Sequence, residues 1–228
     1  QISFSSDGQF FLTSSEDKTV KLFSESNAKV LREYEAHDEA VNAVSIHPDG
    51  LHFISGSADG VLKIWEITDI SPKKPILIFK SPITSLSFDP TGKYFVAGSA
   101  EGEIKVFPFD YDLDEPVFEL NKHSARINSL YWSQDSTQLL SASADKVAYL
   151  WDLDFKNKSG KNTTSFSNHG ASVTRAIFHP KKEWVITASE DHNINIFTKD
   201  GKVFKTLRKH TGSVTDITLS ADGLKLYS

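Results

Sequence analysis

The segment Ser55–Trp65 decides the fold: it reads SGSADGVLKIW and recurs with variations along the chain. Related segments begin at Thr13, Ala97, Ser141 and Thr187. The acidic residue at the fifth position of each segment stands at 17, 59, 101, 145 and 191, in steps of 42, 42, 44 and 46. The aromatic residue that closes each segment stands at 23, 65, 107, 151 and 197, in the same steps. A sustained period of this length predicts a repeat protein.

The amino-acid composition further limits the class of protein to which the chain can belong. With 39% hydrophobic and 24% charged residues, the 228-residue chain has the balance of an ordinary globular protein. The absence of cysteine excludes disulfides and Cys-ligated metals. A net charge of −5 argues against a nucleic-acid binder. No apolar run approaches the length needed to span a bilayer, and no secretory leader opens the chain.

The second unit shows how each period is expected to fold. Val41–Ile46 alternates apolar and polar residues, as a half-buried strand does. The turn residues Pro48, Asp49 and Gly50 end it, and two further strands follow on either side of a second turn at Asp59 and Gly60. A fourth strand is expected at 76–79. Four strands per period without helical periodicity predict an all-β fold built from the blades of a β-propeller.

These motifs resemble WD40 repeats, and the resemblance covers the whole chain. It rests on the Ser-Gly-Ser-x-Asp segments, the Pro-Asp-Gly turn, histidines at unit starts and the Trp151-Asp152 pair. The resemblance implies that a histidine, a Ser or Thr, an aspartate and a tryptophan of each blade form a buried hydrogen-bond network. The residues at these positions are His37, Ser55, Asp59, Trp65, His123, Ser141, Asp145, Trp151, His169, Thr187 and Asp191. The fifth unit has Phe197 instead of tryptophan, and the third unit departs most, with Ser81 and Ala97.

The period also defines the domain organisation. One propeller domain is expected over 1–228, with units at about 1–36, 37–80, 81–122, 123–168 and 169–209 and a partial unit at 210–228. About five and a half four-stranded blades are thus visible, whereas seven would need about 300 residues. With no methionine at position 1, we expect the chain to be a fragment of a longer, seven-bladed propeller protein. Donation of the missing blades by a partner chain is the alternative.

Catalysis and metal binding are not expected. Four of the eight histidines are explained as unit-start residues, His47 and His179 precede turn prolines, and His52 and His192 are interpreted as isolated. The repeated Ser, His and Asp resemble a hydrolase triad, but a catalytic site would be unique. The acidic cluster of Asp110, Asp112, Asp114 and Glu115 lacks the glycine of a calcium loop and is interpreted as a solvated loop. The sequence therefore predicts no enzyme, no metal and no cofactor.

Binding is expected on the rim, where a rigid scaffold presents loops. The resemblance implies that partner contacts come from the unit-start loops and from the turns before each acidic residue. These residues are Glu16, Ala40, Asn42, Ala58, Thr84, Ala100, Arg126, Asn128, Ala144, Ser172, Thr174, Glu190 and Ser213. Arg126 is the favoured contact, because arginine is enriched at interface hot spots.

Two functions remain open at this level. The first is a non-catalytic intracellular scaffold, nuclear or cytoplasmic, that binds proteins or peptides on its rim within a multiprotein complex. The second is a nucleic-acid-associated module of a ribonucleoprotein or chromatin assembly, contacted through basic stretches at 154–161, 181–182 and 199–209. A role as a ubiquitin-ligase receptor is disfavoured, because Trp151-Asp-Leu-Asp154 lacks the arginine of a Trp-Asp-x-Arg motif.

Overall fold

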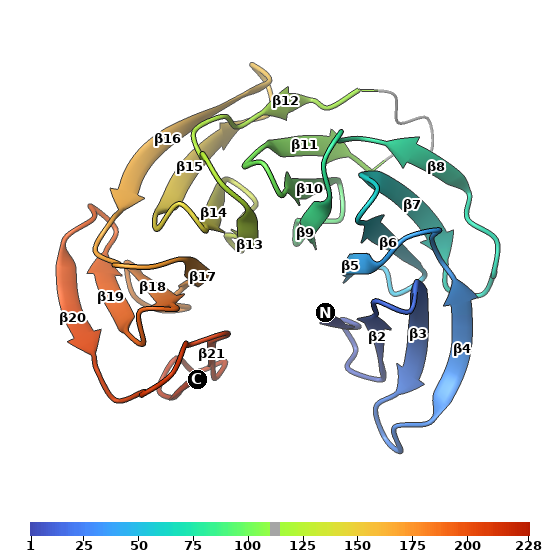
Figure 1. The fold of residues 1–228 in the computed structure, drawn as a ribbon, viewed down its shortest axis with the longest axis horizontal. Helices are drawn as coiled ribbons and strands as arrows, with labels where there is room; N and C mark the ends of the chain where they lie inside the picture. The colour runs from blue at the N-terminus through green and yellow to red at the C-terminus, as the bar shows by residue number, and fades with distance from the viewer. Residues whose placement is uncertain (110–114) are drawn as a thin grey trace. The chain divides into compact units, whose positions relative to one another are not determined.

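A computed structural model describes residues 1–109 and 115–228, which form all-β structure (Figure 1). It contains five four-stranded antiparallel sheets and one two-stranded sheet, so the predicted all-β fold of WD40 propeller blades is confirmed. The described residues include no helix that is long and apolar enough to cross a membrane. The chain divides into two compact units, 1–100 with 104–119 and 101–103 with 120–228.

The first unit holds three blades, whose strands pair in chain order. The first blade comprises β1 (Ile2–Phe4), β2 (Phe10–Ser14), β3 (Thr19–Ser24) and β4 (Val30–Glu35). The second comprises β5 (Val41–Ile46), β6 (His52–Ser57), β7 (Val61–Glu66) and β8 (Lys74–Leu77). The third comprises β9 (Ile83–Phe88), β10 (Tyr94–Ser99), β11 (Ile104–Pro108) and β12 (Phe118–Glu119).

The second unit holds two complete blades and a two-stranded sheet. The fourth blade comprises β13 (Ile127–Trp132), β14 (Gln138–Ser143), β15 (Ala148–Asp154) and β16 (Ser159–Phe166). The fifth comprises β17 (Val173–Phe178), β18 (Trp184–Ser189), β19 (Ile194–Thr198) and β20 (Val203–Leu207). The last sheet pairs β21 (Thr218–Leu219) with β22 (Leu226–Tyr227).

The hydrophobic core lies between neighbouring blades, because successive residues of a strand face opposite sides of its sheet. In β6, Phe53 packs into a cluster with residues of the first blade, whereas Ile54 packs into a cluster with the third. In β7, Trp65 likewise packs with residues of the first blade, and Ile64 packs with residues of the third. A corresponding cluster joins the fourth blade to the fifth. The second sheet is therefore packed on both faces, which holds the ends of its strands in defined positions.

Candidate functional site

The fourth blade joins four side chains through a buried series of hydrogen bonds. Trp151 Nε1 donates to Ser141 Oγ at 2.8 Å, and Ser141 Oγ lies 2.7 Å from His123 Nε2. His123 Nδ1 lies 2.7 Å from Asp145 Oδ2. Since the carboxylate only accepts, Nδ1 carries the hydrogen and Nε2 accepts from the Ser141 hydroxyl. Burial lowers the pKa of His123, and Asp145 partly opposes that shift.

The fifth blade builds the same arrangement without the indole. His169 Nε2 lies 2.7 Å from Thr187 Oγ1, and His169 Nδ1 lies 3.0 Å from Asp191 Oδ2. Burial disfavours the charge on Asp191, but bonds from the Gly170 N–H and from His169 hold the pKa of its carboxyl below the usual value. Phe197 stands in place of tryptophan and is fully packed into the core, 1% exposed.

The second blade differs at the carboxylate. Ser55 Oγ accepts from Trp65 Nε1 at 2.9 Å and lies 2.8 Å from His37 Nε2. Asp59, however, accepts from the N–H of Val61, and His37 Nδ1 has no hydrogen-bond partner among the residues that the structure describes. Burial and the nearby Lys63 ammonium lower the pKa of His37 to about 4. The implied bond between Asp59 and His37 is therefore not made.

The third blade lacks the residue types for such a network, with Ser81, Ala97 and Phe107 at the positions of the histidine, the hydroxyl and the indole. Ser81 Oγ is buried and has no hydrogen-bond partner within residues 1–109 and 115–228. Lys105 instead donates from Nζ to the carbonyl oxygen of Ile78 at 3.0 Å and lies over the Phe79 ring, 5.0 Å from its centre.

The resemblance of these networks to a hydrolase triad is limited to residue types. Ser141 is 0% exposed, and its hydroxyl oxygen is already bonded to both Trp151 and His123. A nucleophile must reach its substrate with an activated, accessible oxygen. The arrangement therefore stabilises a turn and is unsuited to acyl transfer.

The backbone of the predicted rim is fixed by a repeated hydrogen bond. In each complete blade of the second to fifth units, the turn residue before the acid donates its N–H to the carbonyl oxygen of the unit-start loop. The bonds are Ala58 to Ala40 (2.9 Å), Ala100 to Pro82 (2.9 Å), Ala144 to Arg126 (2.9 Å) and Glu190 to Ser172 (3.0 Å). Each bond joins the two backbone stretches from which the predicted contacts come.

Four of the predicted rim residues sit at register shifts in their first strands. Asn42, Thr84, Asn128 and Thr174 are each skipped in the pairing between the first and second strands of a blade. Asn42 Nδ2 donates to the Ile83 carbonyl oxygen of the next blade at 3.0 Å, and Asn128 Nδ2 donates to that of Val173 at 2.8 Å. Thr174 Oγ1 donates to the Val214 carbonyl oxygen at 2.7 Å. These bulges direct side chains towards neighbouring backbone, and Thr84 is itself buried.

The exposed part of the predicted rim is therefore smaller than the sequence indicates. Glu16, Arg126, Glu190 and Ser213 are exposed, whereas Ala40, Ala58, Ala100, Ala144 and Ser172 are partly buried. Within the part of the chain that the structure describes, the side chain of Arg126 makes no hydrogen bond or ion pair. An exposed guanidinium on a fixed backbone can bind a carboxylate in two-pronged fashion.

The basic stretches are partly neutralised. Lys199 pairs with Glu183 at 3.1 Å, and Lys202 pairs with Asp200 at 2.8 Å. Lys182 lies over the ring of Trp184, 4.0 Å from its centre. The acidic cluster of the third unit falls mostly outside the described residues, since Asp110, Asp112 and Asp114 belong to 110–114.

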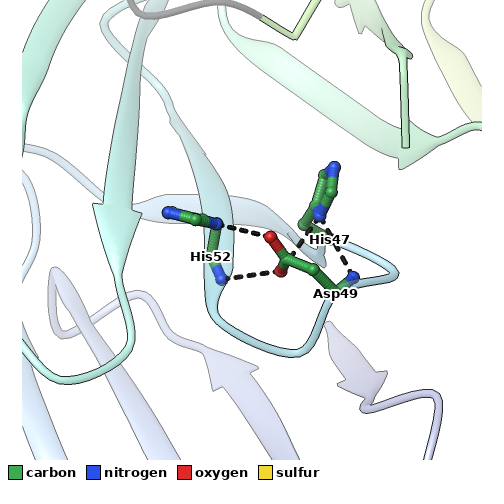
Figure 2. A group of neighbouring side chains, drawn as sticks. All are labelled: His47, Asp49 and His52. Carbon is green, nitrogen blue, oxygen red and sulfur yellow. Dashed lines mark hydrogen bonds and ion pairs between the residues drawn. The ribbon is translucent and has the colours of Figure 1, made fainter.

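A group that the sequence reasoning missed lies between β5 and β6. His52 Nδ1 is 2.7 Å from Asp49 Oδ2, and His47 Nδ1 is 3.0 Å from Asp49 Oδ1 (Figure 2). Interpreting His52 as isolated was therefore wrong. Although burial opposes it, bonds from the Leu51 N–H and from His52 lower the pKa of Asp49 to about 2. The signal in the sequence was a His-x-Asp-x-x-His spacing across a tight turn, which brings the three side chains together.

The repeated sheets and the histidine–hydroxyl–carboxylate–indole bonds define the class of the molecule as a WD40 β-propeller protein. A model of the IFT122 first beta-propeller matches residues 1–228. The chain belongs to this family.

Several curated proteins are similar over shorter stretches. WD repeat-containing protein 1 of Gallus gallus is 30% identical over 129 residues, which are 54% of this chain and 20% of that protein. THO complex subunit 3 of Arabidopsis thaliana is 27% identical over 46% of this chain and 34% of its own length. The human U5 small nuclear ribonucleoprotein 40 kDa protein is 30% identical over 34% of this chain and 21% of its own length. The chain therefore matches only about a third or less of the length of each.

Proposed function

We propose that this chain is a non-catalytic scaffold, which binds a protein or peptide partner on the rim formed by the unit-start loops and the turns before each acidic residue. The observation that carries the proposal is the repeated backbone bond between these two stretches, for example Ala144 to Arg126 at 2.9 Å. Because the backbone is already fixed, a partner gains contacts there without the entropic cost of ordering a loop.

Arg126, at the start of the fourth blade, is the proposed centre of the contact. It is exposed on the loop before β13, and the adjacent Ile127 anchors that loop in the core at 0% exposure. An arginine held in this way presents a guanidinium to an acidic side chain or a chain terminus of the partner. Substituting glutamate reverses the charge at the contact without touching a buried atom.

The setting that we propose is intracellular, nuclear or cytoplasmic, within a multiprotein complex. Support comes from the names of the relatives, two of which are called subunits or components of a THO complex and of a U5 small nuclear ribonucleoprotein. The THO complex and the U5 small nuclear ribonucleoprotein are assemblies of those two relatives. For this chain, the names support only the general expectation that it is a subunit of a hetero-complex.

The test is affinity capture from native extract with the full-length protein, comparing wild type with Arg126→Glu. The matched control is Lys161→Glu, which makes the same charge change at an exposed residue of β16, away from the rim positions. We expect a defined set of proteins to be captured by wild type and by the control, and to be lost with Arg126→Glu.

Two outcomes would contradict the proposal. Capture that is equal for all three proteins would place the contact elsewhere. Capture that disappears after nuclease treatment or at moderate salt, for wild type as well, would favour the nucleic-acid module, because phosphate contacts weaken steeply with salt.

A further inference from the structure

We propose that His47, Asp49 and His52 form a binding site for a divalent transition-metal ion, with Zn²⁺ as the best match. One nitrogen of each histidine and a carboxylate oxygen lie within 4.8 Å of one another. His47 and Asp49 lie in the turn that joins β5 to β6, and His52 is the first residue of β6 (Figure 2). Imidazole and carboxylate are ligands that zinc accepts, and a three-residue set leaves a position for water.

The orientation of the His47 ring is fixed by its other nitrogen. His47 Nε2 lies 2.9 Å from the carbonyl oxygen of Gly92, which only accepts hydrogen bonds, so Nε2 carries the hydrogen. The N–H of Asp49 points at Nδ1 from 3.1 Å, which indicates that Nδ1 presents a lone pair. Metal-binding histidines characteristically donate their second ring N–H to a carbonyl or carboxylate. His47 is therefore oriented as a ligand.

This orientation creates an electrostatic conflict that a cation would remove. The lone pair of His47 Nδ1 and the Asp49 Oδ1 atom are both acceptors, and they lie 3.0 Å apart. A proton or a metal ion between the two atoms would turn this repulsion into attraction, and the ion would replace the bond from the Asp49 N–H to Nδ1. In tetrahedral zinc sites with bonds of about 2.0–2.1 Å, neighbouring ligand atoms are separated by roughly 3.3 Å. The contacts of 3.0 Å and 2.7 Å to Asp49 fall short of this separation by roughly 0.3 Å and 0.6 Å.

The surrounding residues hold the group in place. The His47 ring stacks on Phe109 with centres 4.4 Å apart and meets the edge of Phe88 at 4.9 Å. A Cβ atom at position 92 would lie 2.4 Å from His47 Nε2, so the ring occupies space that only glycine leaves open. The side chains remain 13%, 32% and 18% exposed for His47, Asp49 and His52, which gives an ion and its water access.

The matched turn of the fifth blade provides an internal control. His179 also precedes a turn proline, but Lys181 stands at the position of Asp49 and Trp184 at that of His52. His179 Nδ1 accepts from the backbone N–H groups of Lys181 and Lys182, at 3.1 Å each. The histidine therefore serves the turn in both blades, and only the second blade adds the two further ligands.

Isothermal titration of the metal-free full-length protein with ZnCl₂ tests the site. We expect one Zn²⁺ to bind at this site and to raise the melting temperature. Asp49→Asn and His52→Gln should each weaken this binding by more than about tenfold, because each removes a ligand. His179→Gln should leave binding unchanged. The metal-free variants are compared with wild type by circular dichroism to establish that they fold.

A second measurement needs no variant. On addition of Zn²⁺ to ¹⁵N-labelled protein, the imidazole nitrogen signals of His47 and His52 should shift together, whereas those of His179 should not. The proposal is overturned if wild type shows no saturable binding at millimolar Zn²⁺. It is equally overturned if binding survives both Asp49→Asn and His52→Gln, or if the nitrogen signals of His47 and His52 do not move.

Discussion

The second and fourth blades carry the same four residue types at the same spacing, yet only the fourth completes the hydrogen bonds among them. His123 is bonded on both ring nitrogens, to Ser141 and Asp145. His37 is bonded on one, to Ser55. Equivalent residue types at equivalent positions therefore determine which polar groups are buried. The residues around them determine which of these groups form hydrogen bonds with one another.

The groups around the histidine differ between the two blades. Ser124 follows His123, and its N–H donates to Asp145 at 3.1 Å, which draws the carboxylate onto the histidine. Asp38 follows His37 instead, so that two carboxylates, Asp38 and Asp59, act on one imidazole. Like charges that share a site repel one another. Lys63 completes the contrast by donating to the Ala36 carbonyl oxygen at 2.7 Å beside His37.

The largest effect is expected where the two blades agree. Ser55→Ala and Ser141→Ala each remove an oxygen that bonds both a histidine and a tryptophan, which leaves two buried groups without a partner. Each should lower the free energy of unfolding by about 2–4 kcal/mol. Urea denaturation measures this change. A loss below about 1 kcal/mol in either variant would show that water replaces the hydroxyl.

The second largest effect is expected to differ between the fourth and the second blade. Asp145→Asn should lower the free energy of unfolding by about 1–3 kcal/mol, because the buried His123 loses a charged acceptor. Asp59→Asn should cost less than about 0.5 kcal/mol, because Asp59 is exposed and, among the described residues, its carboxylate accepts only from the Val61 N–H of its own turn. The same denaturation series compares them. Equal losses would mean that Asp59 bonds His37 in solution.

Acid should act on the second blade through His37. Its pKa is about 4 in the folded protein and about 6.5 when unfolded, so the unfolded state binds a proton first as the pH falls. The contribution of His37 to the free energy of unfolding is therefore fully present above pH 6.5 and is lost as the pH falls towards 4. At pH 5 the loss is about 1–2 kcal/mol. Denaturation between pH 7.5 and 4.5 should show a shallower slope for His37→Gln. Identical slopes for wild type and variant would refute the assignment.

How far the sequence leads depends on whether a feature repeats. The strands, their inter-blade cores and the positions of Ser55 and Ser141 follow from a period that five copies reinforce. Features that occur once were not predicted. The spacing of residues does not show that the Asp59 carboxylate accepts from the Val61 N–H in place of His37, and the clustering of His47 with His52 depends on how one turn closes. The bulges were also missed, although they recur in four blades. They direct side chains such as those of Asn42 and Asn128 to the backbone of a neighbouring blade, which alternation along a single strand does not reveal.

The smallest effect concerns the turn that follows each acidic residue. The second blade has Gly60 there with φ +81°, whereas the fourth has Lys146 with φ +74°. A residue with a Cβ is strained in this left-handed region by about 1–2 kcal/mol. Replacing it with glycine removes the strain but costs about 0.5–1 kcal/mol, because the unfolded chain becomes more flexible. Lys146→Gly should therefore raise the free energy of unfolding by only about 0.5 kcal/mol. Urea denaturation of this variant beside Lys158→Gly, which also has positive φ but lies between β15 and β16, tests whether the gain belongs to the turn. If the free energy of unfolding decreased for Lys146→Gly but not for Lys158→Gly, the Lys146 side chain would stabilise the fourth blade. Gly60, which has no side chain, cannot make such a contribution in the second blade.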